Sequence, residues 1–306
     1  MFIRPKMLDK GGTIMIIAPA YKLTEQEGKK AAAEIEQLGF KVKFGKNTFL
    51  DTDQYAATAL ERAEDFNAAI KDESVDMLLF GGGEVSLEIL ELIDYGAILK
   101  SKKIICSYSD STSILCAVTS MSGLVTFYGM SPSALCGQSE YNIGCFERAF
   151  LQADCKSHIP NSKWVKINGG TAYGCMIGGY LLNFALFCTS KYFTYNKDQK
   201  YILFLEDNIR FNKPAAVSRY FSYIEQSGIF KNVSGLIWGH YALSEYSEVD
   251  NILSRIAKAY NIPVVKTDDF GHGANRAVLP IGIEARLDVD KMSLQYTQAF
   301  TEKKSK

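Results

Sequence analysis

The chain has 306 residues, of which 47% are hydrophobic and 22% charged, a composition that supports a buried core and excludes intrinsic disorder. Its 34 basic and 34 acidic residues give a formal net charge of zero, which argues against a nucleic-acid partner and gives no reason to expect an anionic membrane partner. No apolar run approaches the roughly 18 residues that a membrane helix needs.

Cysteine and histidine usage narrows the possible chemistry. The seven cysteines are odd in number and contain no CxxC pair, so we expect free thiols in a reducing cytoplasm rather than disulfides or a zinc site. The apolar run 14–18 ends at Pro19 and is too short for a signal peptide. Only His158, His240 and His272 can supply an imidazole base. We expect no metal and no cofactor.

The first half of the chain alternates strand and helix patterns. Thr24 and Glu27 form a capping-box pattern before a helical repeat of apolar residues. Repeated units of this length predict a parallel sheet with helices on both faces. The predicted elements are strands over 13–18, 40–44, 75–80 and 103–107, and helices over 24–38, 58–70, 86–93 and 111–120.

The second half has a different pattern. A connecting stretch over 138–163 contains a predicted helix at 145–154, and we place a domain boundary near 145–165. The predicted elements that follow are strands over 201–205, 233–238 and 263–266, a helix over 215–227, and an alternating segment over 281–287 before a short final strand.

Ser109 and Asp110 lie where a predicted strand passes directly into a helix. A serine at such a junction presents its hydroxyl above the sheet edge, and the next backbone N–H lies at a helix N-terminus that favours an oxyanion. The alternative interpretation is that either residue only caps the helix. Gly81–Gly83 follow the preceding strand and form either a tight turn or a source of N–H donors for an anion.

Three further candidates lie in the second half. Glu206 and Asp207 end an apolar strand, where functional groups gather at the carboxyl edge of a sheet, although either carboxylate can cap a turn instead. His272 lies between two glycines in a loop and can approach a neighbour closely, although a loop histidine is usually a surface residue. His240 follows a strand and is a rival base, whereas His158 is the weakest of the three histidines.

Taken in order, these segments resemble the LD-carboxypeptidase family of serine peptidases, which also contains the microcin C self-immunity (MccF-like) proteins. The resemblance spans nearly the whole chain and depends on the ordered set of motifs. They are Ile17-Ala18-Pro19, the glycine turn, Tyr108-Ser109-Asp110-x-Thr112, Phe127-Tyr128-Gly129, Gly178-Gly179, Thr189, Phe204-Leu205-Glu206-Asp207, Gly228-x-Phe230, Gly235, Gly239, Gly271-His272-x-x-Asn275 and Leu279-Pro280-x-Gly282.

The resemblance implies a Ser-Glu-His triad. Ser109 would be the nucleophile, His272 the general base and Glu206 the carboxylate that orients the imidazole. The backbone N–H groups of Asp110 and of Gly82 or Gly83 would bind the oxyanion.

The same resemblance implies the domain organisation. An α/β domain with a flavodoxin-like or Rossmann-like parallel sheet (1–150) would carry the nucleophile. A connector (151–164) would lead to a smaller β-rich domain (165–306) that carries the glutamate and the histidine.

The chain departs from the family pattern at four positions. Ser107 replaces a glycine before the nucleophile, which puts the local backbone angles in question. Glu84, Met130 and Tyr180 replace other usual residues, and we expect Glu84 to repel acidic substrates.

Two substrate classes stay open at this point. The carboxypeptidase branch removes terminal D-alanine from murein tetrapeptides during cell-wall recycling, and the Glu206-Asp207 pair favours this branch. The MccF-like branch cleaves peptidyl- or aminoacyl-adenylate mimics, for which the aromatic segments 192–195 and 238–241 could stack on a nucleobase.

The partner would therefore be a small peptide or an aminoacyl nucleotide, with no nucleic acid and no membrane. The family also suggests a homodimer, and a non-catalytic binding protein is the remaining alternative.

Overall fold

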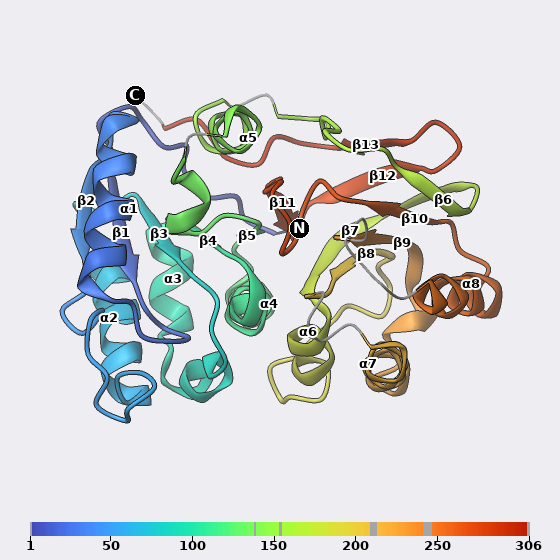
Figure 1. The fold of residues 1–306 in the computed structure, drawn as a ribbon, viewed down its shortest axis with the longest axis horizontal. Coiled ribbons are helices and arrows are strands. Elements are labelled where there is room, and N and C mark those ends of the chain that lie inside the picture. Colours follow the sequence, from blue (N-terminus) through green and yellow to red (C-terminus); the bar gives the residue numbers. More distant parts are fainter. Residues whose placement is uncertain (1, 138, 153–154, 209–212, 241–246, 305–306) are drawn as a thin grey trace.

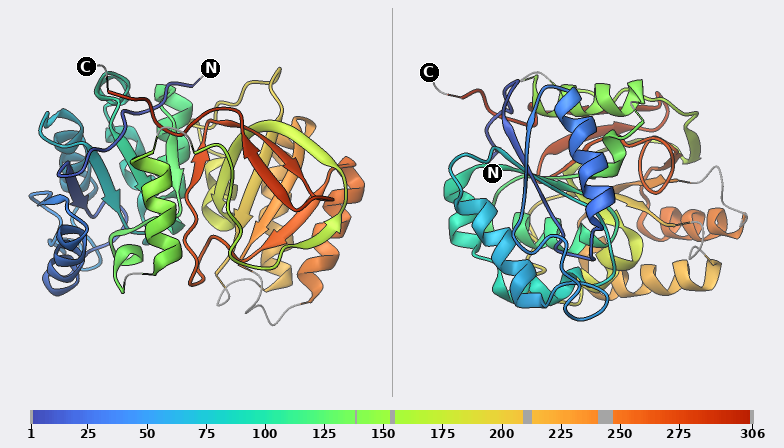
Figure 2. Two further views of the ribbon diagram at one scale, coloured as in Figure 1. Left: turned by 90° about the horizontal axis from the view of Figure 1, so that it is seen from above. Right: turned by 60° about the vertical axis from the view of Figure 1, so that its left-hand side comes forward.

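The computed structural model describes residues 2–137, 139–152, 155–208, 213–240 and 247–304. The chain forms two β-sheets that lie side by side, each covered by helices, so the fold is mixed α/β as predicted (Figure 1). The blue-to-green strands lie on one side of the molecule and the yellow-to-orange strands on the other (Figure 2). No helix in these ranges is long and apolar enough to cross a membrane.

The first sheet is parallel except at one edge. Its strand order is β11-β5-β4-β3-β1-β2, and only β11 is antiparallel to its neighbour. The order 2-1-3-4-5 of the first five strands is that of flavodoxin-like sheets, in which ligands bind where the strand order reverses, between β1 and β3. The strands are β1 (Thr13–Ile17), β2 (Lys41–Phe44), β3 (Met77–Phe80), β4 (Ile104–Ser107), β5 (Thr126–Tyr128) and β11 (Leu279–Ile281).

Helices connect these strands as the sequence pattern predicts, except that the helix Tyr95–Ser101 was not predicted. Thr24 and Thr58 each form a complete capping box, which sets where the first two helices begin. The helix predicted at 86–93 is a 3₁₀ helix, Ser86–Leu92, and a shorter one spans Ser109–Ser111. The α-helices are α1 (Glu25–Gln37), α2 (Ala59–Lys71), α3 (Tyr95–Ser101), α4 (Thr112–Ser122) and α5 (Glu140–Phe150).

The bounds predicted for the helix at 145–154 were wrong. The observed helix, α5, begins at Glu140, because the Ser139 side chain accepts a hydrogen bond from the backbone N–H of Asn142 and caps the helix there. It ends at Phe150, and residues 153–154 lie outside the described part of the chain.

The second sheet is mixed, in the order β13-β12-β7-β8-β9-β10-β6. Its four central strands, β7 to β10, are parallel, and the flanking strands are antiparallel. The strands are β6 (Val165–Asn168), β7 (Thr171–Tyr180), β8 (Tyr201–Glu206), β9 (Val233–Gly239), β10 (Val264–Thr267), β12 (Glu284–Asp288) and β13 (Ser293–Tyr296). The helices are α6 (Leu181–Phe187), α7 (Pro214–Gln226) and α8 (Glu248–Tyr260).

The two halves are joined by more than the connector. The segment 281–287, predicted as one strand, is divided at Gly282, whose φ of +105° turns the chain. The part before the turn is β11, which pairs with β5 in the first sheet, and the part after it is β12 of the second sheet (Figure 1). Helices α4 and α6 also pack against each other where the halves meet. These contacts fix the position of the parallel strands of the first sheet relative to those of the second sheet.

Candidate active site

Ser109 lies two residues after the end of β4 and has a strained backbone. Its φ is +60°, a conformation that is costly for a residue with a side chain and is typical of the sharp turn that exposes a nucleophile. The strain lies at Ser109 and not at Ser107, which continues β4 and donates its hydroxyl to the carbonyl oxygen of Phe80 at 2.7 Å. Serine in place of the family's glycine therefore tethers this turn without straining it.

The hydroxyl of Ser109 lies 2.8 Å from Nε2 of His272. On the other side of the ring, Nδ1 of His272 lies 2.9 Å from both carboxylate oxygens of Glu206, which ends β8 and is fully buried. The structure thus brings together the three residues that the sequence predicts as a triad, in the order hydroxyl, imidazole, carboxylate. Such a chain can activate a serine, because the imidazole takes its proton and the carboxylate holds the ring.

Glu206 is ionised in spite of its burial. Burial alone would raise the pKa of this carboxyl, but the His272 ring and the Tyr128 hydroxyl lower it below its usual value. Tyr128 donates its hydroxyl to Oε1 of Glu206 at 2.5 Å and accepts the backbone N–H of Ser109 at 3.1 Å. The sequence motif Phe127-Tyr128-Gly129 contained this residue, but no local pattern indicated its bridging role.

Asp110 anchors the turn through its side chain. Its carboxylate accepts the backbone N–H of Ser86 at 2.8 Å and a side-chain N–H of Asn183 at 2.5 Å. Thr112 donates its hydroxyl to the carbonyl of Ser109 and accepts the backbone N–H of Tyr180, so the turn is tied to the second half of the chain. The N–H of Ser109 already binds Tyr128, whereas the backbone N–H of Asp110 remains a candidate oxyanion donor.

Gly82 lies directly against Ser109. A Cβ at this position would lie 2.4 Å from Cβ and 2.9 Å from Oγ of Ser109, so only glycine allows this approach. Gly83 instead backs onto Ala20, where a Cβ would lie 2.3 Å from the carbonyl oxygen. Of the two glycines, Gly82 is the one whose backbone lies beside the serine.

Ser109 and His272 line a cavity of about 650 Å³. The cavity lies at the ends of β1, β3 and β4, the place where flavodoxin-like sheets bind their ligands. Its remaining walls are Ile17, Ala18, Tyr21, Lys22, Leu23, Glu27, Lys30, Ala31, Gly81, Gly82, Gly83, Tyr108, Ser131, Pro132, Ser133, Cys136 and Asn208.

The other two histidines have different partners, although His240 lies near Glu206 and His272. His240 is buried, and its backbone N–H donates to the carbonyl of Thr267 at 3.0 Å. Burial lowers the pKa of its imidazole. His158 binds the carboxylate of Asp269 instead of contributing to the cavity. Neither is bonded to Ser109, so the geometry favours His272 over its rivals.

Glu84 and Tyr180 are two further positions at which the chain departs from the family pattern. Glu84 is exposed and is not among the residues that line the cavity, but its charge acts on the buried carboxyl of Asp110, so the expected repulsion of acidic substrates stays a prediction. The Tyr180 ring packs against the His272 ring with a centroid distance of 5.0 Å. In the described part of the chain, no three His, Cys, Asp or Glu side chains are grouped closely enough to hold a metal ion.

The chain was compared with known proteins. It is 27% identical to a "Putative carboxypeptidase" of Treponema pallidum (93% of this chain and 92% of the relative). It is 26% identical to the microcin C7 self-immunity protein MccF of Escherichia coli (92% and 91%). It is also 26% identical to a "Probable murein peptide carboxypeptidase" of Bacillus subtilis (93% and 91%).

Solved structures agree with the fold. A MccF-like protein from Bacillus anthracis superposes with a TM-score of 0.89 at 25% identity, covering 97% of this chain and 99% of that chain. MccF in complex with aspartyl sulfamoyl adenosine superposes with a TM-score of 0.84 at 24% identity, covering 98% of this chain and 100% of that chain, a likeness that concerns the fold alone.

Two family models cover most of the chain. The LD-carboxypeptidase N-terminal domain matches residues 14–129, and the LD-carboxypeptidase C-terminal domain matches residues 173–287. The first match contains Ser109, and the second contains Glu206 and His272. The chain therefore belongs to the LD-carboxypeptidase family.

Proposed function

We propose that this protein is a serine hydrolase that cleaves a peptide-type amide through Ser109, His272 and Glu206. One observation carries the proposal: the continuous contact from Oγ of Ser109 through the His272 ring to the buried Glu206 carboxylate, at the edge of a cavity. Membership in a peptidase family supports the same reaction class.

The mechanism follows from this geometry. Ser109 Oγ attacks the scissile carbonyl while Nε2 of His272 takes the hydroxyl proton. Glu206 holds Nδ1–H and stabilises the imidazolium, and the backbone N–H groups of Asp110 and Gly82 bind the oxyanion. The imidazolium then gives its proton to the leaving amine. Water, deprotonated by His272, hydrolyses the acyl-enzyme and returns Ser109 to its starting state.

We propose terminal D-alanine of murein tetrapeptides as the leaving group. The name of the Bacillus subtilis relative supports this substrate class. The aromatic residues considered for nucleobase stacking are already engaged, since Trp238 is buried against Phe221 and Phe193 packs between Phe187 and Tyr195. Tyr241, the last of that set, lies outside the described residues.

The second candidate substrate is an aminoacyl or peptidyl adenylate mimic. The similarity to MccF, which has been solved with aspartyl sulfamoyl adenosine, supports it. Tyr21 supports it independently, because this aromatic residue lines the cavity and is 41% exposed, and an exposed aromatic ring can stack on a base.

One experiment separates these substrates. The purified protein and its Ser109→Ala variant are incubated with a murein tetrapeptide ending in D-alanine and, separately, with an aminoacyl-sulfamoyl adenosine, and the products are followed by mass spectrometry. Ser109-dependent loss of D-alanine supports the first substrate, and Ser109-dependent release of the free amino acid supports the second. If neither occurs and a fluorophosphonate fails to label Ser109, the protein is the non-catalytic binding homologue.

The family resemblance also leads us to propose a cytoplasmic homodimer. Light scattering on the purified protein tests the dimer, and fractionation of the producing cells tests the location.

A further inference from the structure

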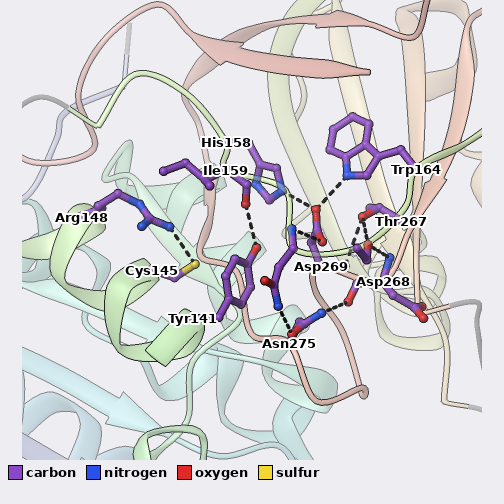
Figure 3. Close-up of polar contacts among 12 residues, drawn as sticks. Tyr141, Cys145, Arg148, His158, Ile159, Trp164, Thr267, Asp268, Asp269 and Asn275 are labelled. Carbon is purple, nitrogen blue, oxygen red and sulfur yellow. Dashed lines mark hydrogen bonds and ion pairs between the residues drawn. The ribbon is translucent and has the colours of Figure 1, made fainter. Parts of the chain in front are cut away.

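A buried polar cluster connects the segment before the second sheet to the loop that carries His272. Its centre is Asp269, which is fully buried and lies three residues before the histidine. Oδ2 of Asp269 accepts hydrogen bonds from Nε2 of His158 at 2.7 Å and from Nε1 of Trp164 at 2.8 Å (Figure 3). Oδ1 accepts the backbone N–H of Asn161 at 2.9 Å. We call these four residues the Asp269 clasp.

The charge at the centre of the clasp is stabilised by its donors. Burial alone would raise the pKa of Asp269, but the His158 ring, the Trp164 indole and the Asn161 backbone amide lower it to about 2. The carboxylate is therefore ionised at neutral pH. Hydrogen bonds to an ionised acceptor are about twice as strong as those between neutral groups, so they fix this part of the loop firmly.

The same segment holds the loop on the far side of His272. Nδ2 of Asn161 donates to Oδ1 of Asn275 at 2.9 Å. Nδ2 of Asn275 donates in turn to the carbonyl of Asp268 at 3.0 Å (Figure 3). Asn161 thus contacts the loop both before and after the histidine, through Asp269 and Asn275. These contacts close the loop upon itself.

We propose that the Asp269 clasp positions the imidazole of His272 for the reaction of Ser109. None of its four members lines the cavity, so they are positioning residues and not catalytic ones. His272 lies between Gly271 and Gly273, and two glycines do not define a loop conformation by themselves. A displacement of about 1 Å at a reacting group can cost roughly 10²-fold in rate, so an external anchor has a measurable effect.

The proposal rests on the proposed function, and its test uses variants of graded severity. Asp269→Asn removes the charge that the three donors share. His158→Leu removes one donor, whereas His158→Gln keeps an N–H near the position of Nε2. Asp65→Asn is the matched control, because Asp65 lies on α2 in the other half of the chain, is also buried, and accepts the backbone N–H of Asn47.

We expect kcat of Asp269→Asn and His158→Leu to fall roughly tenfold to 10²-fold with KM unchanged. His158→Gln should retain most of the turnover, and Asp65→Asn should lower the melting temperature without lowering kcat. If His158→Gln and His158→Leu lose activity equally, or if all clasp variants keep the wild-type kcat, the positioning role is wrong.

A second readout does not depend on turnover. Protein labelled with ¹⁵N-histidine contains only three labelled side chains, and the Nδ1–H proton of His272 that faces Glu206 should give a distinct low-field resonance. We expect this resonance to shift or broaden in Asp269→Asn and His158→Leu and to be retained in Asp65→Asn. An unchanged resonance in the folded clasp variants overturns the proposal. Full hydrolysis by Ser109→Ala would instead overturn the proposed function, while the resonance would still report the position of His272.

Discussion

Oε2 of Glu206 accepts the backbone N–H of His272 at 3.1 Å, while Nδ1 of the same residue lies 2.9 Å from both carboxylate oxygens. One carboxylate therefore holds the histidine by its ring and by its main chain. The Glu206 carboxylate lies so close to the main chain of Gly271 that a Cβ on this glycine would lie 2.7 Å from Oε2. Glycine before the histidine is thus a steric requirement of this arrangement.

Replacement of Glu206 by glutamine tests the role of its charge. Glutamine keeps the size of the side chain, but it cannot stabilise the imidazolium and its amide N–H₂ can favour the wrong tautomer of His272. We expect kcat to fall by roughly 10⁴-fold, as in other triads whose carboxylate is neutralised. Steady-state kinetics on the cleaved substrate measure the loss, and circular dichroism checks that the variant is folded. A loss of less than about tenfold would contradict the assigned role.

The two histidines near Glu206 should behave differently. His272→Ala removes the only imidazole bonded to Ser109 in the described part of the chain and should reduce turnover to the level of Ser109→Ala. His240→Ala should keep most of the turnover, because its ring is not bonded to the serine. Labelling of Ser109 by a fluorophosphonate, followed over time, measures both effects. Equal labelling of the two variants would remove His272 from the mechanism.

Tyr128 should contribute to stability as well as to activity. Tyr128→Phe removes a buried donor to Glu206 and leaves the N–H of Ser109 without that acceptor. An unsatisfied buried polar group costs about 1–3 kcal/mol, so we expect the free energy of unfolding to fall by that amount. Urea denaturation measures the change, with Tyr223→Phe as the control, since Tyr223 is 41% exposed. Equal stability of the two variants would show that the bridge contributes nothing.

Much of the fold follows from local patterns. Apolar runs that end at Pro19 or Gly81 predicted β1 and β3, and the capping box at Thr24 predicted the start of α1. β7 was not predicted, because its glycines interrupt the alternation. The division between β11 and β12 was missed because the apolar pattern continues across Gly282, while the chain there changes sheets.

The site was predictable only where residues lie in recognisable motifs. Ser109, Glu206 and His272 each occupy such a motif, and the structure brings them into contact. Tyr128 binds a glutamate 78 positions away, and Asp269 binds a histidine 111 positions away. No local pattern encodes such partnerships, because the first depends on how the two halves of the chain pack and the second on how the connector packs against the second half.

Replacement of Ser107 tests what serine does at the position where the family usually has glycine. Its hydroxyl is buried and donates to the carbonyl of Phe80, so Ser107→Gly removes a hydrogen bond and adds flexibility to the end of β4. We expect a loss of about 1–2 kcal/mol in the free energy of unfolding with kcat nearly unchanged. Urea denaturation and steady-state kinetics on one preparation check both. A large fall in kcat would mean that serine here sets the position of Ser109.

Asp207 should make stability depend on pH. It follows Glu206, and Oδ2 is buried without a hydrogen-bond partner in the described part of the chain. Burial, and then the charge of Glu206, raise its pKa from 3.8 to about 8. Between these values the folded protein holds a proton that the unfolded chain releases, so this group lowers stability as pH rises through that window, and the loss levels off above pH 8.

Asp207→Asn tests this dependence, because asparagine resembles the protonated acid and cannot ionise. The stability of the variant relative to the wild type should increase from pH 5 to pH 9, by a few kcal/mol at most, since one unit of pKa corresponds to about 1.4 kcal/mol. Urea denaturation of both proteins at pH 5, 7 and 9 measures the difference, with the exposed Asp198→Asn as the control. Parallel curves for wild type and Asp207→Asn would mean that Asp207 is ionised throughout, with its charge balanced by another group.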